Sequence, residues 1–466
     1  MDEIDDIFNL GNAKPLIDFK KRSERKSASN TVVDNMDHIT FDPEVQKEID
    51  DIVENGASKY ITGVAGSGKS TMVSRIVHDL RKKGKNVVIL APSGVAAVNI
   101  GGQTIHSFFK FPPKPISYRT VPTPIPGYEK QYTKVDVFII DEISQVRADL
   151  LDGIHWFYVK NFHSTDPFGG KQMIFVGDLM QLPPVLGTDA EKEMFAQQYK
   201  SEFFFDASVM EKFHYKKVIL EKVHRQKDPI FLEFLNKVRN NEITEEEIEK
   251  FHEVTYKSGR TNPNAITLST MNRMADQMNQ VSLSMVPGEL VEKKATITGY
   301  FDPKTTRAPE YLQLKKGCKV MTILNDPEGR YFNGSIGEVV EIYENEIIIK
   351  IKGEEVTISR KEFENIKFNY DRLEQKMTYQ SVGTFTQFPL VLAYGISVHK
   401  SQGMTFEEVN LDIGGTSFAH GQAYVALSRC KSMEGINMIT KLRRSDIKVD
   451  PKVLNYFKSE NLKLDI

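Results

Sequence analysis

A stretch of eight residues, 63–70, has the pattern G-x-x-x-x-G-K-S, which binds phosphate groups. A strand is expected just before it, and apolar residues with helical spacing follow it. In that context backbone N–H groups and the helix N-terminus surround a pyrophosphate. Lys69 would reach the β- and γ-phosphates, and the Ser70 hydroxyl would hold Mg²⁺. The residues expected to contact the nucleotide are Gly63, Val64, Ala65, Gly66, Ser67, Gly68, Lys69, Ser70 and Thr71.

Two carboxylates, Asp141 and Glu142, follow an apolar run at 138–140. At the carboxyl end of a parallel strand they would face the phosphate loop. Asp141 would hold Mg²⁺ through water, and Glu142 would orient and deprotonate an attacking water. A kinase needs no such base, so the pair predicts hydrolysis of a nucleoside triphosphate.

Three further side chains are candidates for contact with the γ-phosphate. Gln181 lies in a Gly-Asp…Gln-Leu-Pro-Pro loop, 177–184, that follows another apolar run. Arg225 and Arg429 could stabilise the charge that develops during hydrolysis, an effect of ~10³-fold or more in related enzymes. An isolated arginine is usually a surface charge, so these two assignments depend on their surrounding motifs.

Composition limits the remaining possibilities. The 466 residues suggest about three domains, and 40% hydrophobic with 27% charged residues is typical of a globular protein. The net charge of −2 predicts that any nucleic-acid site is local. No apolar run approaches 18 residues and no signal peptide is recognised, so we expect no membrane partner. Cys318 and Cys430 are expected to be buried and reduced. The basic cluster at 20–26 predicts a solvated arm over 1–38, with phosphate contact or a nuclear signal as alternatives.

The elements that must position these residues form an α/β pattern. Strands are expected at 60–64, 87–91, 135–140 and 173–176 of a first unit, 39–225, which contains a proline-rich excursion at about 110–130. A second unit, 226–466, has expected strands at 265–270, 390–393, 409–413 and 436–439. Between 290 and 385 the sequence pattern indicates β-strands alone, expected at 319–324, 337–343, 346–351 and 355–359.

Taken in order, the motifs resemble one family, the PIF-type (petite integration frequency) helicases of superfamily one, class B, which move 5′ to 3′ on single-stranded DNA. The resemblance covers about residues 39–442, and 146–151 with 167–172 is similar to the signature that sets this family apart. The motifs that carry it lie at 63–71, 91–97 with 102–109, 141–144, 146–151 with 167–172, 177–184, 388–393 with 398–405, and 421–429.

The resemblance implies two RecA-like parallel-sheet domains with an inserted small β-barrel, similar to a Src-homology-three domain, and a short wedge at 110–130. It implies ATP and Mg²⁺ as cofactors, bound between the two domains, with Arg225 and Arg429 closing from the other side of the cleft. Gln46 resembles an adenine-reading glutamine, although a plain surface glutamine remains the alternative, and Gly403 is expected near the nucleotide.

Single-stranded DNA would be held by polar contacts to its backbone and by stacking of bases on aromatic rings. For Phe108 and Phe109, stacking and simple core packing remain equal alternatives. His399 is expected to contact DNA or the other domain rather than a metal, because no second ligand is near. The candidates are Thr104, His106, Ser107, Phe108 and Phe109 on the first unit and His399, Lys400, Ser401, Gln402 and Thr405 on the second.

The implied function is an ATP-dependent DNA helicase that translocates 5′ to 3′ and unwinds duplexes in replication, recombination, repair and telomere maintenance. Its expected partners are single-stranded DNA and tailed duplexes, with forks and G-quadruplex DNA suggested by the family. A RecD- or Dda-like helicase, and a nucleotide-dependent DNA-binding switch that does not unwind, remain alternatives. We expect a monomer in the absence of DNA, located in a bacterial or phage cytoplasm rather than a nucleus or mitochondrion.

Overall fold

The computed structural model describes residues 36, 39–222, 228–257, 259–263, 265–326, 328–371, 373, 376–415, 417 and 419–458. Two expectations therefore fall outside the described residues: Arg225, and the arm at 1–38 except for Met36. Within the described part of the chain, no helix is both long and apolar enough to cross a bilayer.

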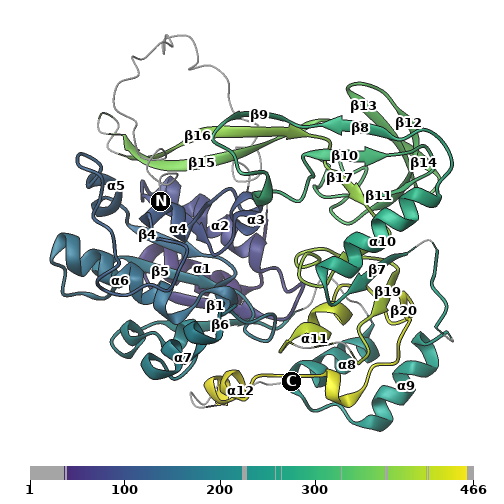
Figure 1. Ribbon diagram of the computed structural model, residues 1–466. Coiled ribbons are helices and arrows are strands. Elements are labelled where there is room, and N and C mark those ends of the chain that lie inside the picture. Colours follow the sequence, from purple (N-terminus) through teal and green to yellow (C-terminus); the bar gives the residue numbers. More distant parts are fainter. Residues whose placement is uncertain are drawn as a thin grey trace.

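The first unit is built on a six-stranded parallel sheet with the order β3-β2-β4-β5-β1-β6 (Figure 1). Alternate residues of β4 face opposite sides: Phe138 and Ile140 pack in one core cluster, Val137 and Ile139 in another. This burial on both faces explains the continuous apolar runs. Its strands are β1 (Lys59–Gly63), β2 (Val87–Ala91), β3 (Gln103–Thr104), β4 (Val137–Ile140), β5 (Gln172–Val176) and β6 (Lys216–Leu220). Its helices are α1 (Pro43–Asn55), α2 (Lys69–Lys82), α3 (Gly94–Asn99), α4 (Ile105–Phe109), α5 (Lys130–Thr133), α6 (Ala148–Phe162) and α7 (Asp189–Gln198), with 3₁₀ turns η4 (Ile143–Gln145), η5 (Pro167–Gly170), η6 (Phe204–Asp206) and η7 (Ser208–Glu211).

The second unit has a four-stranded parallel sheet with the order β18-β7-β19-β20. The expected strand at 390–393 does not belong to this sheet. It forms β17 (Leu390–Leu392), which pairs antiparallel with the all-β segment, and the short β18 (Gly395–Ser397) takes the place beside β7. The remaining elements are α8 (Pro229–Asn240), α9 (Glu245–Thr255), β7 (Ile266–Ser269), α10 (Asn272–Met285), β19 (Val409–Asp412), α11 (Gln422–Leu427), β20 (Ile436–Met438), η9 (Arg444–Asp446) and α12 (Pro451–Lys458).

The all-β segment forms three antiparallel sheets, with strand orders β14-β13-β12-β11-β17, β15-β16-β9 and β10-β8. Its strands are β8 (Val291–Lys294), β9 (Thr296–Gly299), β10 (Tyr311–Leu314), β11 (Lys319–Thr322), β12 (Ile336–Ile342), β13 (Glu346–Ile351), β14 (Glu354–Ser359), β15 (Lys361–Asp371) and β16 (Lys376–Gln387), with the 3₁₀ turn η8 (Pro303–Thr305). We refer to residues 291–392 as the inserted module.

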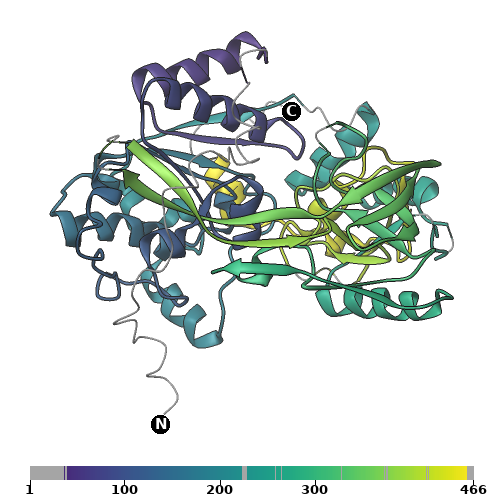
Figure 2. The same ribbon diagram turned by 90° about the horizontal axis from the view of Figure 1, so that it is seen from above.

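The long β15–β16 hairpin of this module reaches from above the second unit to the first (Figures 1 and 2). There the Phe368 amide donates to Gln103 Oε1 at 3.2 Å, and the Met377 amide donates to Asn86 Oδ1 at 2.6 Å. The inserted module therefore contacts both parallel-sheet units.

The last helix also links the two units. After β20 the chain returns to the first unit, where the Tyr456 ring stacks on Phe205 with centroids 4.2 Å apart. Its hydroxyl lies 2.6 Å from that of Tyr215, and Lys217 Nζ lies 3.5 Å from the ring centroid. Helix α12 is thus anchored on the first unit by stacking, a hydrogen bond and a cation–π contact.

Candidate nucleotide site and DNA-facing surface

The loop from β1 to α2 has the geometry of a phosphate cradle. Gly66 and Gly68 have φ values of 85° and 88°, which favour glycine, and α2 begins at Lys69. A Cβ at Gly63 would lie 2.5 Å from the Leu220 carbonyl oxygen, so the backbones of β1 and β6 approach too closely for a side chain. Lys69 Nζ donates to the Gly63 and Val64 carbonyls at 2.8 and 3.0 Å, which holds the ammonium over the loop.

One side chain in this loop supports its fit to a phosphate. Ser67 Oγ is buried and has no hydrogen-bond partner among the residues that the structure describes. An orphaned buried hydroxyl is costly. A phosphate oxygen at this helix N-terminus would satisfy it. Ser70 and Thr71 are exposed at the first turn of α2, where the Ser70 hydroxyl is accessible to a metal ion.

The two carboxylates lie at the carboxyl end of β4, the strand next to β5 in the sheet. Burial raises the pKa of Asp141, whereas a hydrogen bond from the Glu142 backbone and the charge of Lys69 oppose the increase. Burial, followed by repulsion from Asp141, raises the pKa of Glu142 to about 7, and the charges of Lys69 and Arg429 oppose it. A carboxylate with a pKa close to neutrality suits a general base, and cations from both units act on it.

Arg429 is only 1% exposed and lies at the end of α11. Its guanidinium donates from Nε to the Val425 carbonyl at 2.9 Å and from Nη2 to Ser428 Oγ at 2.9 Å. It is therefore directed inward, on the side of the second unit that faces Glu142. The Ala65 amide of the phosphate loop donates to Tyr424 Oη of the same helix at 3.2 Å, so α11 contacts the loop directly.

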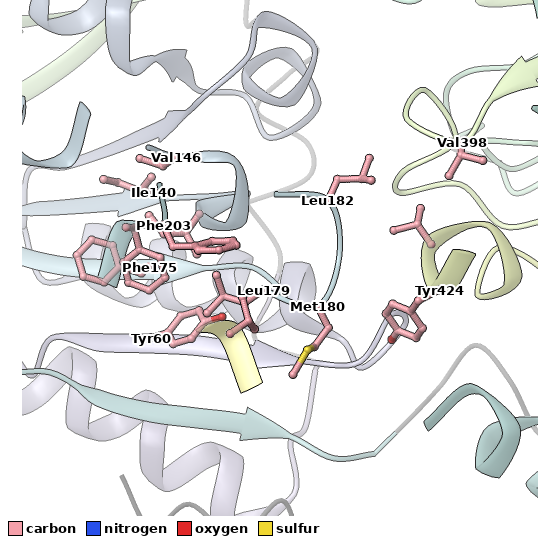
Figure 3. Close-up of a cluster of buried hydrophobic side chains, with 14 of the residues drawn as sticks. Tyr60, Ile140, Val146, Phe175, Leu179, Met180, Leu182, Phe203, Val398 and Tyr424 are labelled. Atoms are coloured by element: carbon pink, nitrogen blue, oxygen red, sulfur yellow. The ribbon is translucent and has the colours of Figure 1, made fainter. Parts of the chain in front are cut away.

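The loop that carries Gln181 is clamped between the units. Figure 3 shows Met180 and Leu182 on this loop, with Tyr424 and Val398 of the second unit across from it, and all four belong to one buried cluster. A Cβ on Gly421, the residue before α11, would lie 2.4 Å from the Gln181 carbonyl oxygen. Small movements of either unit must therefore displace this loop.

A buried ion pair accompanies this contact. Asp178 Oδ1 accepts from Arg239 Nη2 of α8 at 3.1 Å, with side-chain exposures of 0% and 9%. Gln181 Nε2 lies 3.5 Å from the second oxygen of Asp178. The ion pair thus fixes the loop of Gln181 to α8, and nothing in the sequence around Arg239 indicates this role.

Gln46 and Gly403, the other two residues predicted to contact the nucleotide, lie outside the phosphate loop in the sequence. Gln46 Nε2 donates to Asp50 Oδ1 of its own helix at 2.8 Å, and its adenine-reading role stays a prediction. Gly403 is exposed with a φ of 77°, and a Cβ there would meet nothing within 4 Å. Within the described part of the chain, neither residue makes a hydrogen bond to the phosphate loop.

Two aromatic candidates for DNA stacking are corrected by the structure. Phe108 and Phe109 are both 0% exposed and pack edge-to-face on one another, with centroids 4.9 Å apart. Phe109 also stacks on Phe111 and packs against Phe157. Both rings belong to the core, because a base cannot stack on a ring that is covered on both faces.

The polar DNA candidates divide into exposed and buried groups. Ser401 is fully buried and its hydroxyl donates to the Val398 carbonyl at 2.8 Å, so this candidate has a structural role instead. Gln402 is also buried, at 8% exposure. The candidates that retain at least partial exposure are Thr104, His106, Ser107, His399, Lys400 and Thr405.

The described residues do not support a metal site formed by clustered side chains or a reactive cysteine. They contain no cluster of three or more histidine, cysteine or acidic side chains able to hold a metal ion. Cys318 and Cys430 are buried and form no disulfide bond, and burial raises the pKa of each thiol to about 11, which disfavours a reactive thiolate.

Comparisons with known proteins agree with this site. The profile of the PIF1-like helicase family matches residues 42–249. The "ATP-dependent DNA helicase Pif1" of Bdellovibrio bacteriovorus is 32% identical over 434 residues, 90% of this chain and 92% of that protein. Bacteroides sp Pif1 in complex with ADP-AlF4 is 33% identical with a TM-score of 0.84, over 91% of this chain and 98% of that one. Bacteroides Pif1 bound to ssDNA is 32% identical with a TM-score of 0.64, over 90% and 97%. The chain therefore belongs to the PIF1-like helicase family and is an ATP-dependent DNA helicase.

Proposed function

We propose that this helicase moves 5′ to 3′ along single-stranded DNA and unwinds duplexes ahead of it, with forks and G-quadruplexes as substrates. The observation that carries the proposal is that the charges of Lys69 of one parallel-sheet unit and Arg429 of the other both lower the pKa of Glu142. A base that is influenced by cations of two units makes hydrolysis sensitive to the separation of those units. The direction of movement rests on the family resemblance at 146–151 and 167–172.

Within the cleft, we assign each side chain a separate task. Lys69 and the loop amides would bind the phosphates, Glu142 would orient and deprotonate water, and Arg429 would stabilise the developing charge. Bound Mg²⁺, held by Ser70 and by Asp141 through water, would neutralise phosphate charge. Arg225, Gln46 and Gly403 complete the proposed site, and Arg225 lies outside the described residues.

We further propose the division of the chain that the motifs suggest: a first domain at 39–225, a second at 226–466, and a β-barrel inserted at 290–385. DNA would contact the exposed residues His399 and Lys400 on the second domain and the rim of α4 on the first. The ssDNA complex of Bacteroides Pif1 supports single-stranded DNA as the partner. We propose a monomer without DNA and a bacterial or phage cytoplasmic location, which the bacterial relatives support.

Movement would follow from alternate gripping by the two domains, one nucleotide per hydrolysis cycle. Nucleotide binding would close the cleft, and phosphate release would open it. A net step requires that each domain binds DNA with a different strength in the two states, because a ligand that binds both states equally shifts nothing.

Strand displacement on matched duplexes tests the direction. We expect ATP-dependent unwinding of a 5′-tailed duplex and little unwinding of a 3′-tailed duplex of the same sequence. Glu142→Gln serves as the control that binds strand but does not turn over. Preference for the 3′ tail would refute the direction, and DNA-stimulated hydrolysis without displacement of either duplex would favour a switch.

A further inference from the structure

Arg307 of the inserted module lies where the three parts of the molecule meet. Its Nη2 donates to the backbone carbonyl of Gln402 at 2.9 Å. Gln402 Oε1 in turn accepts from Gln145 Nε2 at 3.2 Å. Gln145 ends the 3₁₀ turn η4, which begins directly after Glu142. A chain of hydrogen bonds therefore runs from the inserted module, through the predicted DNA motif, to the turn that follows the proposed base.

The charges at this junction also favour an effect on Glu142. Burial lowers the pKa of Arg307, and the Glu142 carboxylate is the neighbouring group that opposes the decrease. The guanidinium and the carboxylate therefore attract one another electrostatically. The buried Nε2 of Gln402 has no hydrogen-bond partner in the described part of the chain, so hydrogen bonding at this junction is incomplete.

The backbone around Arg307 is held in place by the first unit. The turn η8, which ends two residues earlier at Thr305, packs against the start of α3. A Cβ at Gly94 would lie 2.5 Å from Thr305 Cγ2, so the contact leaves no room for a larger residue. Docking of the inserted module on α3 therefore determines where the Arg307 guanidinium lies.

This docked arrangement is more similar to a relative without DNA than to one with DNA. The TM-score is 0.82 with unliganded Bacteroides Pif1 and 0.64 with the ssDNA-bound form. The contacts of Arg307 thus belong to an arrangement that resembles the DNA-free one.

We propose that Arg307 is a positioning residue that restrains hydrolysis until DNA binds. In the docked arrangement it holds Gln402 against Gln145 and draws the Glu142 carboxylate away from the position in which it would activate water. When the inserted module leaves this position, the restraint is released. The inference rests on the roles of Glu142 and Gln402 given in the proposed function.

Arg307→Ala tests the proposal in the full-length protein. We expect ATP turnover without DNA to increase about five- to twentyfold, as for the loss of one charge-assisted hydrogen bond. Turnover at saturating single-stranded oligonucleotide should stay within about twofold of the unmodified protein, because the restraint is already released. The stimulation ratio, turnover with oligonucleotide divided by turnover without it, should therefore fall. The stimulation ratio of Arg307→Gln should fall less than that of Arg307→Ala, because glutamine keeps a hydrogen-bond donor without the charge.

Lys304→Ala is the matched control, because Lys304 is an exposed cation of the same loop. It should leave both turnover rates unchanged. A purely structural role for Arg307 would lower turnover with and without oligonucleotide together, and that result, or an unchanged DNA-free rate in both Arg307 variants, overturns the proposal. If the unmodified protein itself shows no stimulation by oligonucleotide, the proposed function fails as well, so the two failures are distinguishable.

Discussion

We expect that replacing Glu142 by glutamine stabilises the folded protein and abolishes hydrolysis. Burial and Asp141 raise the pKa of Glu142 from its ordinary value of 4.5 to about 7. Between these pH values the folded protein binds a proton that the unfolded chain has released, so the free energy of unfolding falls as the pH rises from 4.5 to about 7. Above pH 7 the full penalty of the buried carboxylate is present. A neutral amide avoids it.

The expected size follows from the same pKa. A pKa difference of about 2.5, at ~1.36 kcal/mol per pH unit, gives an upper limit of ~3.4 kcal/mol. Glu142 is half-buried, so solvent screening reduces the gain to about 1–3 kcal/mol. For the parallel-sheet unit that contains this residue, such a gain raises the melting temperature by roughly 2–12 °C.

Thermal unfolding of both proteins between pH 5 and pH 8.5 checks this reasoning. Nucleotide and Mg²⁺ are left out, since their own charges would shift the pKa of Glu142. We expect equal melting temperatures near pH 5 and a growing advantage of Glu142→Gln toward pH 8. The exposed Glu289, changed to glutamine, is the control and should show no such trend. An unchanged or lower melting temperature of Glu142→Gln at pH 8 would refute the burial argument.

Three further changes separate the roles assigned above. Lys69→Ala should abolish DNA-stimulated hydrolysis and leave oligonucleotide binding largely intact, measured by ATPase assay and fluorescence anisotropy; normal turnover would overturn the site. Arg239→Met should cost about 3–5 kcal/mol, because Asp178 is left charged and buried; a loss below about 1 kcal/mol in denaturant unfolding would contradict the importance of this ion pair. Phe109→Ala should cost about 3–5 kcal/mol through the cavity it leaves, while the folded fraction binds oligonucleotide within about twofold of normal; a large loss of affinity at unchanged stability would restore the stacking interpretation.

The nucleotide site could be predicted from the sequence because its signals are local. The loop at 63–70 and the acids at 141 and 142 each follow a buried strand directly, and the structure has those strands at Lys59–Gly63 and Val137–Ile140. The spacing of such motifs along the chain is enough to place them at one edge of a parallel sheet.

The features that were not predicted from the sequence depend on contacts between distant segments of the chain. The hairpin of β15 and β16 was not expected, since few of its residues are fully buried and its polar side chains hide any alternation. The burial of Phe109 could not be read from its neighbours, because the rings that cover it include Phe157, on α6. Arg307 lies in no motif, and only the docking of the inserted module brings it to Gln402.

The anchoring of α12 has a mechanical consequence. The chain passes between the two parallel-sheet units once after β6 and again before α12, and the second passage ends in the stacked Tyr456. Two bodies joined by two tethers cannot turn freely about either one; they can only swing about a line through both. The units should therefore open by rotation about this hinge line. The displacement should be largest at the far end of the inserted module and almost zero at the stacked ring of Tyr456.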